Sequence, residues 1–254
     1  MVNEKTQDRA RTLRNRERLA QNRNLLFWYR ELYQDQFRHL PGPATLSILE
    51  IGSGTSPLKQ FHSNIVTSDI LDLDYLDLVF DCHEIDKLEA IKDNSLDVIT
   101  LTNVLHHLKN PIAFLNLAAH KLKPGGKVIA TEPFFSILST AIYKCLHHEA
   151  VDFDAGEPEL REVRGPLSSA NQALPWLIFF RRRDWLQRLD GNYDIASLSL
   201  RPFTALSYMI TGGISHKLPI PGFLYRALFP IDLALSRCFP RLCASFFTVT
   251  LTRR

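Results

Sequence analysis

Short apolar runs alternate with helical stretches in the first half of the chain, and this alternation constrains the fold more than any other feature. Five runs are typical of strands, at residues 47–51, 64–68, 77–80, 97–102 and 127–131. Helical stretches separate them, most clearly at residues 111–122, which begin at Pro111 and are followed by Gly125 and Gly126. Repeated strand–helix–strand units predict a mainly parallel sheet with helices on both faces and right-handed crossovers.

The segments on either side of this region follow other patterns. Residues 3–40 read as helix, because no proline interrupts them and aromatic residues recur at helical intervals. After residue 133 we expect helices at 136–147 and 183–189, a polar loop at 149–171, and strands at 193–200 and 245–251. These features predict a helical cap (1–43) and one α/β domain (44–254), in which residues 133–180 and 202–244 are insertions that cover the substrate.

The composition indicates an ordinary globular protein. The 254 residues can bury a full core, and 45% are hydrophobic and 22% charged. A net charge of +3 is too mild to indicate a nucleic-acid partner by itself. The charged N-terminus lacks the apolar core of a signal peptide, and no run is long and apolar enough to span a bilayer. The four cysteines form no zinc-binding pattern, so we expect buried free thiols and a cytoplasmic location. They are Cys82, Cys145, Cys238 and Cys243.

A glycine-containing turn follows the first predicted strand, in the segment LEIGSGTSPL. Gly52 allows the chain to turn sharply, and Gly54 allows backbone to approach a ligand closely. By itself this pattern also fits a dinucleotide site or a plain tight turn.

Three acids at strand ends make the turn more informative. Glu50 lies inside the first strand, where a carboxylate needs a cation or hydrogen-bond donors. Asp69 ends the second strand and could accept both hydroxyls of a ribose, or cap the next helix. Asp81 ends the third strand and could accept from an adenine amino group, or again cap a helix. A nucleotide-like ligand at the carboxyl edge of the sheet accounts for all three.

Four segments also occur in the order of known motifs: LEIGSGT, SDI, DNSLDVITLTNVLHHLKNP and LKPGGKVIATEP. Over residues 47–133 the chain resembles class I S-adenosylmethionine-dependent methyltransferases, and most of all the branch that includes the ubiquinone and menaquinone methylases. Family members often carry a third glycine where Ser56 stands, so we expect a slightly different loop that still binds the cofactor.

This resemblance implies a Rossmann-like fold with S-adenosylmethionine as cofactor. The expected sheet has seven strands, mostly parallel with an antiparallel last strand, and the N-terminal helices and the late insertion form a lid. The implied cofactor-binding residues are Glu50, Gly52, Ser53, Gly54, Asp69, Ile70, Asp81, Cys82, Thr102 and Asn103.

The methyl group is expected to face the segment after the fourth strand, because ligands of parallel sheets bind at the carboxyl ends of the strands. Candidates for the residue that removes a proton from the acceptor are His106, His107, Glu132 and His148, with His147 and Glu149 beside them. Alternatively, one of the first two histidines packs under the cofactor and Glu132 caps a loop. We expect no metal, because adjacent histidines on a helix point in different directions.

The apolar insertion at residues 202–239 indicates the kind of acceptor. Its aromatic and aliphatic residues either pack in the core or form a lid over an apolar acceptor. Scattered Lys and Arg residues would also allow peripheral contact with a membrane surface. We therefore expect a small hydrophobic or lipid-linked acceptor, methylated at oxygen or at an activated carbon.

Three other functions fit parts of the sequence. A nicotinamide-dependent oxidoreductase would share the glycine turn but not DNSLDVI or LKPGG. A non-catalytic binding protein could keep the fold, although the intact Gly52, Gly54 and Asp69 argue against this. A nucleic-acid methyltransferase often carries an Asn-Pro-Pro-aromatic motif after the fourth strand, where this chain has TNVLHHL, so we expect no nucleic-acid partner.

Overall fold

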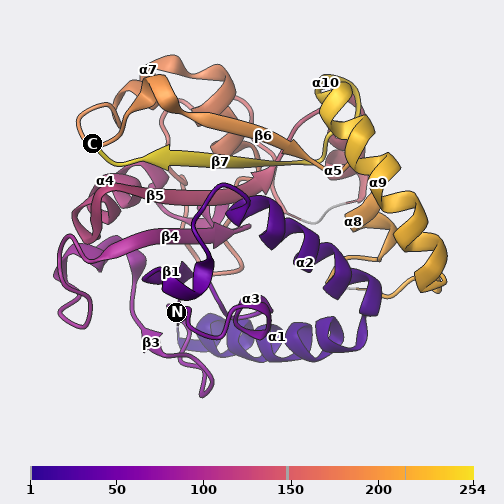
Figure 1. Cartoon of the computed structure of the whole chain (residues 1–254), viewed down its shortest axis with the longest axis horizontal. Coiled ribbons are helices and arrows are strands. Elements are labelled where there is room, and N and C mark those ends of the chain that lie inside the picture. Colours follow the sequence, from indigo (N-terminus) through magenta and orange to yellow (C-terminus); the bar gives the residue numbers. More distant parts are fainter. Residues whose placement is uncertain (1, 147–148, 215) are drawn as a thin grey trace.

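The computed structural model describes residues 2–146, 149–214 and 216–254. Its strands are β1 (Ile48–Ile51), β2 (Val66–Asp69), β3 (Leu78–Val79), β4 (Leu96–Thr102), β5 (Leu122–Pro133), β6 (Ser199–Phe203) and β7 (Phe246–Thr252). They form one sheet in the order β3-β2-β1-β4-β5-β7-β6 (Figure 1). Strands β1 to β5 are parallel, and β7 is antiparallel to both of its neighbours. The expected seven-stranded, Rossmann-like sheet is confirmed, with β1 beside β4.

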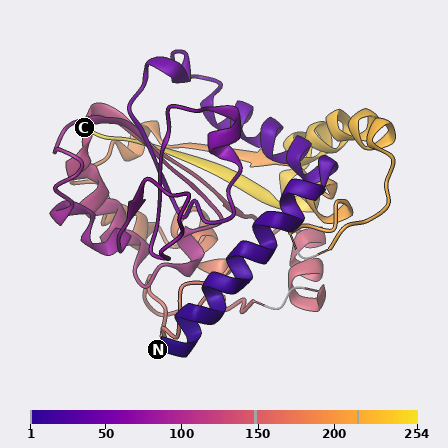
Figure 2. The same ribbon diagram turned by 90° about the horizontal axis from the view of Figure 1, so that it is seen from below.

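Helices cover both faces of this sheet (Figures 1 and 2). The α-helices are α1 (Val2–Gln21), α2 (Arg23–Phe37), α3 (Leu58–Phe61), α4 (Pro111–Lys121), α5 (Ile137–Leu146), α6 (Ala173–Trp176), α7 (Arg183–Gln187), α8 (Ser207–Ile210), α9 (Gly222–Cys238) and α10 (Pro240–Cys243). Shorter helical turns are η1 (Pro43–Thr45), η2 (Cys82–Lys87), η3 (Leu105–His107), η4 (Leu177–Arg181) and η5 (Ile195–Ser197). Residues 149–171 contain neither helix nor strand, as expected.

The helical region expected over residues 3–40 consists of two helices, α1 and α2, because the chain breaks at Asn22. The Asn22 side chain accepts a hydrogen bond from the backbone N–H of Leu25, so it caps α2. Its amide group also donates to the carbonyl oxygen of Thr211, 3.0 Å away. This break lets α1 and α2 run in different directions, and Figure 2 shows α1 crossing one face of the molecule.

Helix α2 carries the aromatic stripe, and its side chains pack in the core. Trp28 is fully buried and contacts the rings of Phe203 and Phe246, which belong to β6 and β7. The adjacent Phe27 meets the rings of Tyr225 and Phe229 from α9. Helix α2 therefore links the sheet to the late insertion.

Strand β6 begins later in the sequence than expected. The strand expected at 193–200 is wrong over residues 193–198, because Asp194 caps the η5 turn by accepting from the N–H of Ala196. Tyr193 makes only an isolated bridge to Arg253. Strand β6 starts at Ser199 and lies at the sheet edge, where Pro202 can be accommodated.

Two further expectations concern the surface. None of the described helices has the length and apolar character needed to cross a bilayer. The expectation that the cysteines are buried holds for Cys82, but it is wrong for Cys238, which is exposed on the outer side of α9.

Candidate active site

The loop after β1 depends on two glycines. Gly52 has a φ of +75°, and a Cβ atom there would lie 2.4 Å from Cγ2 of Val104. At Gly54 a Cβ atom would lie 2.8 Å from Cγ2 of Thr12 and 2.9 Å from Oδ2 of Asp69. A side chain at Gly52 would therefore push against Val104, and one at Gly54 would push against Thr12 of α1 and against Asp69.

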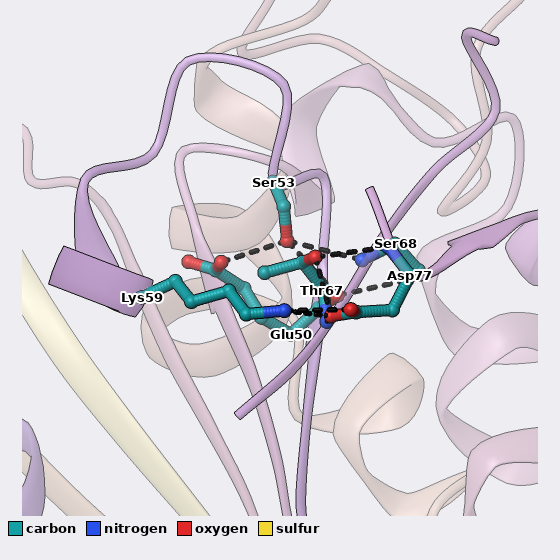
Figure 3. Close-up of polar contacts among 6 residues, drawn as sticks. All are labelled: Glu50, Ser53, Lys59, Thr67, Ser68 and Asp77. Atoms are coloured by element: carbon teal, nitrogen blue, oxygen red, sulfur yellow. Dashed lines mark hydrogen bonds and ion pairs between the residues drawn. The ribbon is translucent and has the colours of Figure 1, made fainter. Parts of the chain in front are cut away.

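Glu50 supports this loop from beneath (Figure 3). Its side chain is buried, and its carboxylate accepts hydrogen bonds from the hydroxyls of Ser53 (2.7 Å) and Ser56 (2.5 Å). Burial raises the pKa of Glu50 to about 7, although both serine hydrogen bonds oppose this shift. Ser56 thus supplies a hydroxyl that the loop uses, and it also bonds the Tyr33 hydroxyl.

Ser53 has a structural part in the same network (Figure 3). Its hydroxyl accepts from the N–H of Ser68, and its own N–H donates to the carbonyl oxygen of Ser68 at 2.8 Å. Neither Ser53 nor Glu50 lines the cavity described below. Both residues were expected to bind the cofactor, but they stabilise the loop through hydrogen bonds outside the cavity lining.

A second network in Figure 3 fixes the end of β2. The carboxylate of Asp77 accepts from the backbone N–H and the hydroxyl of Thr67, both at 2.8 Å, and from the Lys59 ammonium group at 2.6 Å. These bonds join α3, β2 and the segment before β3, and they hold the strand that carries Asp69.

Asp69 faces the glycine loop and does not cap a helix. Its two carboxylate oxygens accept from the N–H groups of Gly54 and Leu71, both at 3.0 Å. No helix begins directly after it, so the capping alternative is not observed. Burial raises the pKa of Asp69. The Tyr75 hydroxyl closes the arrangement by donating to the carbonyl oxygen of Gly54.

Asp81 caps the η2 turn, which is the second of the two roles expected for it. Its carboxylate accepts from the backbone N–H of His83 and contacts the His83 ring nitrogen Nδ1, both at 2.9 Å. Asp81, Cys82 and His83 lie close enough to hold a metal ion. Burial raises the pKa of the Cys82 thiol.

A cavity of about 1130 Å³ opens at the carboxyl edge of the sheet. One part is lined by Gly52, Gly54, Asp69, Ile70, Asp81, Cys82, Thr102 and Asn103. Helix α1 contributes Arg11, Thr12 and Asn15, and the later segments contribute Tyr143, Tyr208, Met209, Leu218 and Phe246. The volume suits a nucleotide-sized ligand together with a second small molecule.

Asn103 lines this cavity and carries a buried polar atom without a partner among the described residues. Its φ is +56°, and its Oδ1 atom is buried without a hydrogen-bond partner among the described residues. Buried acceptors are usually paired, so this oxygen fits a ligand that brings a donor. The neighbouring Thr102 hydroxyl accepts from the side-chain amide of Gln36 on α2.

His106 lies between two carboxylates. Its Nδ1 is 2.5 Å from Oε2 of Glu132, and its Nε2 is 3.4 Å from Oε2 of Glu149. Burial would lower the pKa of His106, but the two carboxylates outweigh it and raise this pKa to about 10. The other oxygen of Glu132 accepts from the N–H groups of Val104 and Leu105. Glu132 therefore both caps the loop and holds His106 as an imidazolium.

His107 is in the opposite state. Its Nδ1 lies 2.8 Å from the carbonyl oxygen of Ser169, an arrangement that suits a neutral ring with the proton on Nδ1. Burial and the charge of His106 lower the pKa of His107 to about 4. Its Nε2 then carries a lone pair, 3.9 Å from Oε1 of Glu149.

The histidine pair and Glu149 also form a group that could hold a metal ion, because their ligand atoms lie within 4.8 Å of one another. In that group both histidines face the carboxylate of Glu149, and the centroids of the His106 and His107 rings lie 4.2 Å apart. His106 already shares its protons with Glu132 and Glu149, so proton sharing accounts for these contacts without a metal. His147 and His148, the other histidine candidates, lie outside the described residues.

Several residues of this site carry no local sequence signal. The Gln172 side chain donates to Oε2 of Glu149 at 2.9 Å, and Ser169 orients His107. Arg16 stacks on the Tyr75 ring with its guanidinium carbon 3.9 Å from the ring centroid. Arg16 comes from α1, and Ser169 and Gln172 come from the loop before α6, so only the fold brings these residues to the site.

The sheet order, the glycine turn after β1 and the acid that ends β2 define a Rossmann-like methyltransferase fold with a nucleotide-sized cavity at its carboxyl edge. Residues 7–191 match the family model described as "Methyltransferase domain". The match covers most of the chain, so the chain belongs to this family and is an S-adenosylmethionine-dependent methyltransferase.

Several solved structures of low sequence identity are similar to the chain. An S-adenosylmethionine-dependent methyltransferase from Archaeoglobus fulgidus is 14% identical, with 88% of this chain and 94% of that chain covered and a TM-score of 0.48. One from Mesorhizobium loti is 15% identical, with 87% and 97% covered and a TM-score of 0.45. Phosphoethanolamine N-methyltransferase 2 from Haemonchus contortus, solved with S-adenosylhomocysteine, is 13% identical, with 89% and 52% covered and a TM-score of 0.46. No curated protein sequence matches the chain.

Proposed function

We propose that the chain transfers the methyl group of S-adenosylmethionine to a small hydrophobic or lipid-linked acceptor, at oxygen or at an activated carbon. The observation that carries this proposal is one continuous cavity, which runs from Gly52 and Asp69 to the apolar wall of Tyr208, Met209 and Phe246. The succession LHHL and LKPGG supports a place near the ubiquinone and menaquinone methylases.

The cofactor would occupy the part of the cavity beside the glycine loop. Asp69 would accept the ribose hydroxyls with the lone pairs that Gly54 and Leu71 leave open. The unpartnered Oδ1 of Asn103 would accept from the cofactor's ammonium group. Ile70, Asp81 and Cys82 would lie along the adenosyl group. When bound there, S-adenosylmethionine supplies an electrophilic methyl group on a sulfonium.

The remaining chemistry is positioning of the acceptor and removal of its proton. His107 could accept that proton at Nε2, because Ser169 holds its Nδ1–H and the lowered pKa of the ring leaves Nε2 unprotonated near neutral pH. His106, kept cationic by Glu132 and Glu149, would act as a positioning residue. The cap (1–43) and the insertions (133–180 and 202–244) would cover the acceptor, because each contributes residues to the cavity wall.

Calorimetry tests the cofactor assignment. Titration with S-adenosylmethionine and with its demethylated product should show that Asp69→Asn binds roughly 10- to 100-fold more weakly than the unmodified chain, which is the effect of weakened hydrogen bonds to a charged group. Asp74→Asn is the matched control, because the Asp74 side chain is 93% exposed. Unchanged affinity in Asp69→Asn would refute the ribose assignment.

The acceptor class needs its own assay. Protein and methyl-labelled S-adenosylmethionine can be incubated with a long-chain alkyl phenol, a polyprenyl-linked sugar, a free sugar or a free amino acid. Label should move into the two apolar probes, because the far wall of the cavity is aromatic and aliphatic. A preference for the free sugar or the amino acid would contradict the proposed acceptor class while leaving the cofactor assignment intact.

A further inference from the structure

Helices α9 and α10 expose an unusual concentration of apolar side chains. Seven of the thirteen large hydrophobic side chains that are exposed in the described residues lie between positions 223 and 242. These seven define the α9–α10 face: Phe223, Leu224, Leu228, Ile231, Leu235, Phe239 and Leu242, each 43–79% exposed. Both views place α9 at the periphery of the molecule (Figures 1 and 2).

The inward side of α9 is apolar as well. Tyr225 and Phe229 are buried, and both pack edge-on against Phe27 of α2. Helix α9 therefore carries apolar side chains on both its covered side and its exposed side. In this chain only one side of α9 is covered, and an exposed apolar surface of this kind marks an interaction site.

The charges around the α9–α10 face are almost all positive. Within residues 217–242 the cations are Lys217, Arg226, Arg237 and Arg241, and the one acid is Asp232. The Asp232 carboxylate accepts from the N–H groups of residues 205–207, so it is turned toward α8. Arg237 is paired with Asp35, whereas Arg226 and Arg241 are exposed and form no ion pair among the described residues.

This charge pattern selects the partner. In a two-fold dimer the same patch meets itself, so Arg226 and Arg241 of two copies would approach each other without acids to balance them. An anionic lipid surface instead accepts the apolar side chains among its acyl chains and attracts the flanking arginines. We propose that the α9–α10 face docks the protein on an anionic lipid bilayer.

The position of the face relative to the cavity supports this proposal. The segment before α9 contributes Gly213, His216 and Leu218 to the cavity wall, and the Leu218 side chain is 45% exposed. Docking through α9 would therefore bring this part of the cavity wall near the bilayer surface. The proposal goes beyond methyl transfer, and binding can be measured without cofactor or acceptor.

Sedimentation with lipid vesicles tests the docking. The full chain should bind vesicles of phosphatidylcholine that contain roughly 30% phosphatidylglycerol, and should bind neutral phosphatidylcholine vesicles at least about tenfold more weakly. Phe223→Ser with Leu228→Ser, and separately Arg226→Gln with Arg241→Gln, should each lower binding to the anionic vesicles by about tenfold or more.

Matched controls use residues far from this face in Figure 1. Val79→Ser removes a half-exposed apolar side chain from β3, and Arg183→Gln removes an exposed cation from α7, so neither should change binding. Absence of vesicle binding by the unmodified chain would overturn the proposal. So would a concentration-dependent dimer in analytical ultracentrifugation that only the α9 variants abolish, because the face would then belong to a second copy.

Discussion

At the scale of single residues, Glu50 shows how this chain uses a buried acid. The carboxylate is 2% exposed and is satisfied by the hydroxyls of Ser53 and Ser56. A buried carboxylate needs such donors, and here they come from the loop that it supports. The acid therefore couples the shape of the glycine loop to its own protonation.

This coupling predicts a pH dependence of stability. Burial raises the pKa of Glu50 from 4.5 to about 7, so the folded chain holds this proton more tightly than the unfolded chain. The stabilising contribution is fully present below pH 4.5 and is lost as the pH rises through 7. Glu50→Gln stays neutral, and its amide can still bond both serines. Between pH 4.5 and about pH 8, the unmodified chain should lose about 3 kcal/mol more free energy of unfolding than Glu50→Gln.

Urea unfolding without cofactor, in a series of buffers, measures this difference. Glu89→Gln, which changes an exposed acid, serves as the control and should follow the unmodified chain. If the free energy of unfolding changes with pH in the same way for Glu50→Gln and for the unmodified chain, Glu50 does not titrate in this range.

At the scale of elements, the strands that were predictable are those whose burial is visible locally. Strands β1, β2 and β4 are short apolar runs bounded by turn residues and occur where the alternation predicted them, whereas β5 contains its predicted run but begins earlier, at Leu122. The start of β6 was not predictable, because Asp194 forms a local turn that competes with the strand. The break at Asn22 was missed because helical periodicity continues on both sides of it.

Asn22 provides a prediction at this scale. Its side chain caps α2 and also satisfies the buried carbonyl oxygen of Thr211. Asn110 only caps, by accepting from the N–H of Ala113 at the start of α4. Asn22→Ala should therefore lower the free energy of unfolding by about 2–3 kcal/mol, and Asn110→Ala by about 1 kcal/mol. Urea unfolding of both variants gives the comparison, and equal losses would mean that the bond to Thr211 adds nothing.

At the scale of the whole molecule, the candidate site divides into predictable and unpredictable parts. Gly52, Gly54 and Asp69 were predictable because each follows or ends a strand, and carboxyl ends of parallel strands meet at one edge. Thr12 and Gln172 were not predictable, because they reach the cavity only through the packing of α1 and the loop before α6. A sequence pattern reports neighbours along the chain, whereas these contacts join segments far apart in it.

The packing of α1 against the glycine loop predicts how the whole chain responds to S-adenosylmethionine. The Thr12 side chain leaves no room for a Cβ at Gly54, and Arg16 stacks on Tyr75, which itself bonds Gly54. A ligand that orders the loop should therefore also order α1. At about 100 times the dissociation constant, binding stabilises the folded state by about 2.7 kcal/mol, so amide exchange in α1 should slow by up to about 100-fold.

Hydrogen exchange followed by mass spectrometry measures this response peptide by peptide. Helix α7 contributes no residue to the cavity and is the internal control, so its local exchange should change little. Arg16→Ala should weaken the protection of α1 while leaving that of the β4 peptides, because Asn103 at the end of β4 lines the cavity independently of α1. Protection at β4 without any at α1 in the unmodified chain would show that the helical cap does not respond to the cofactor.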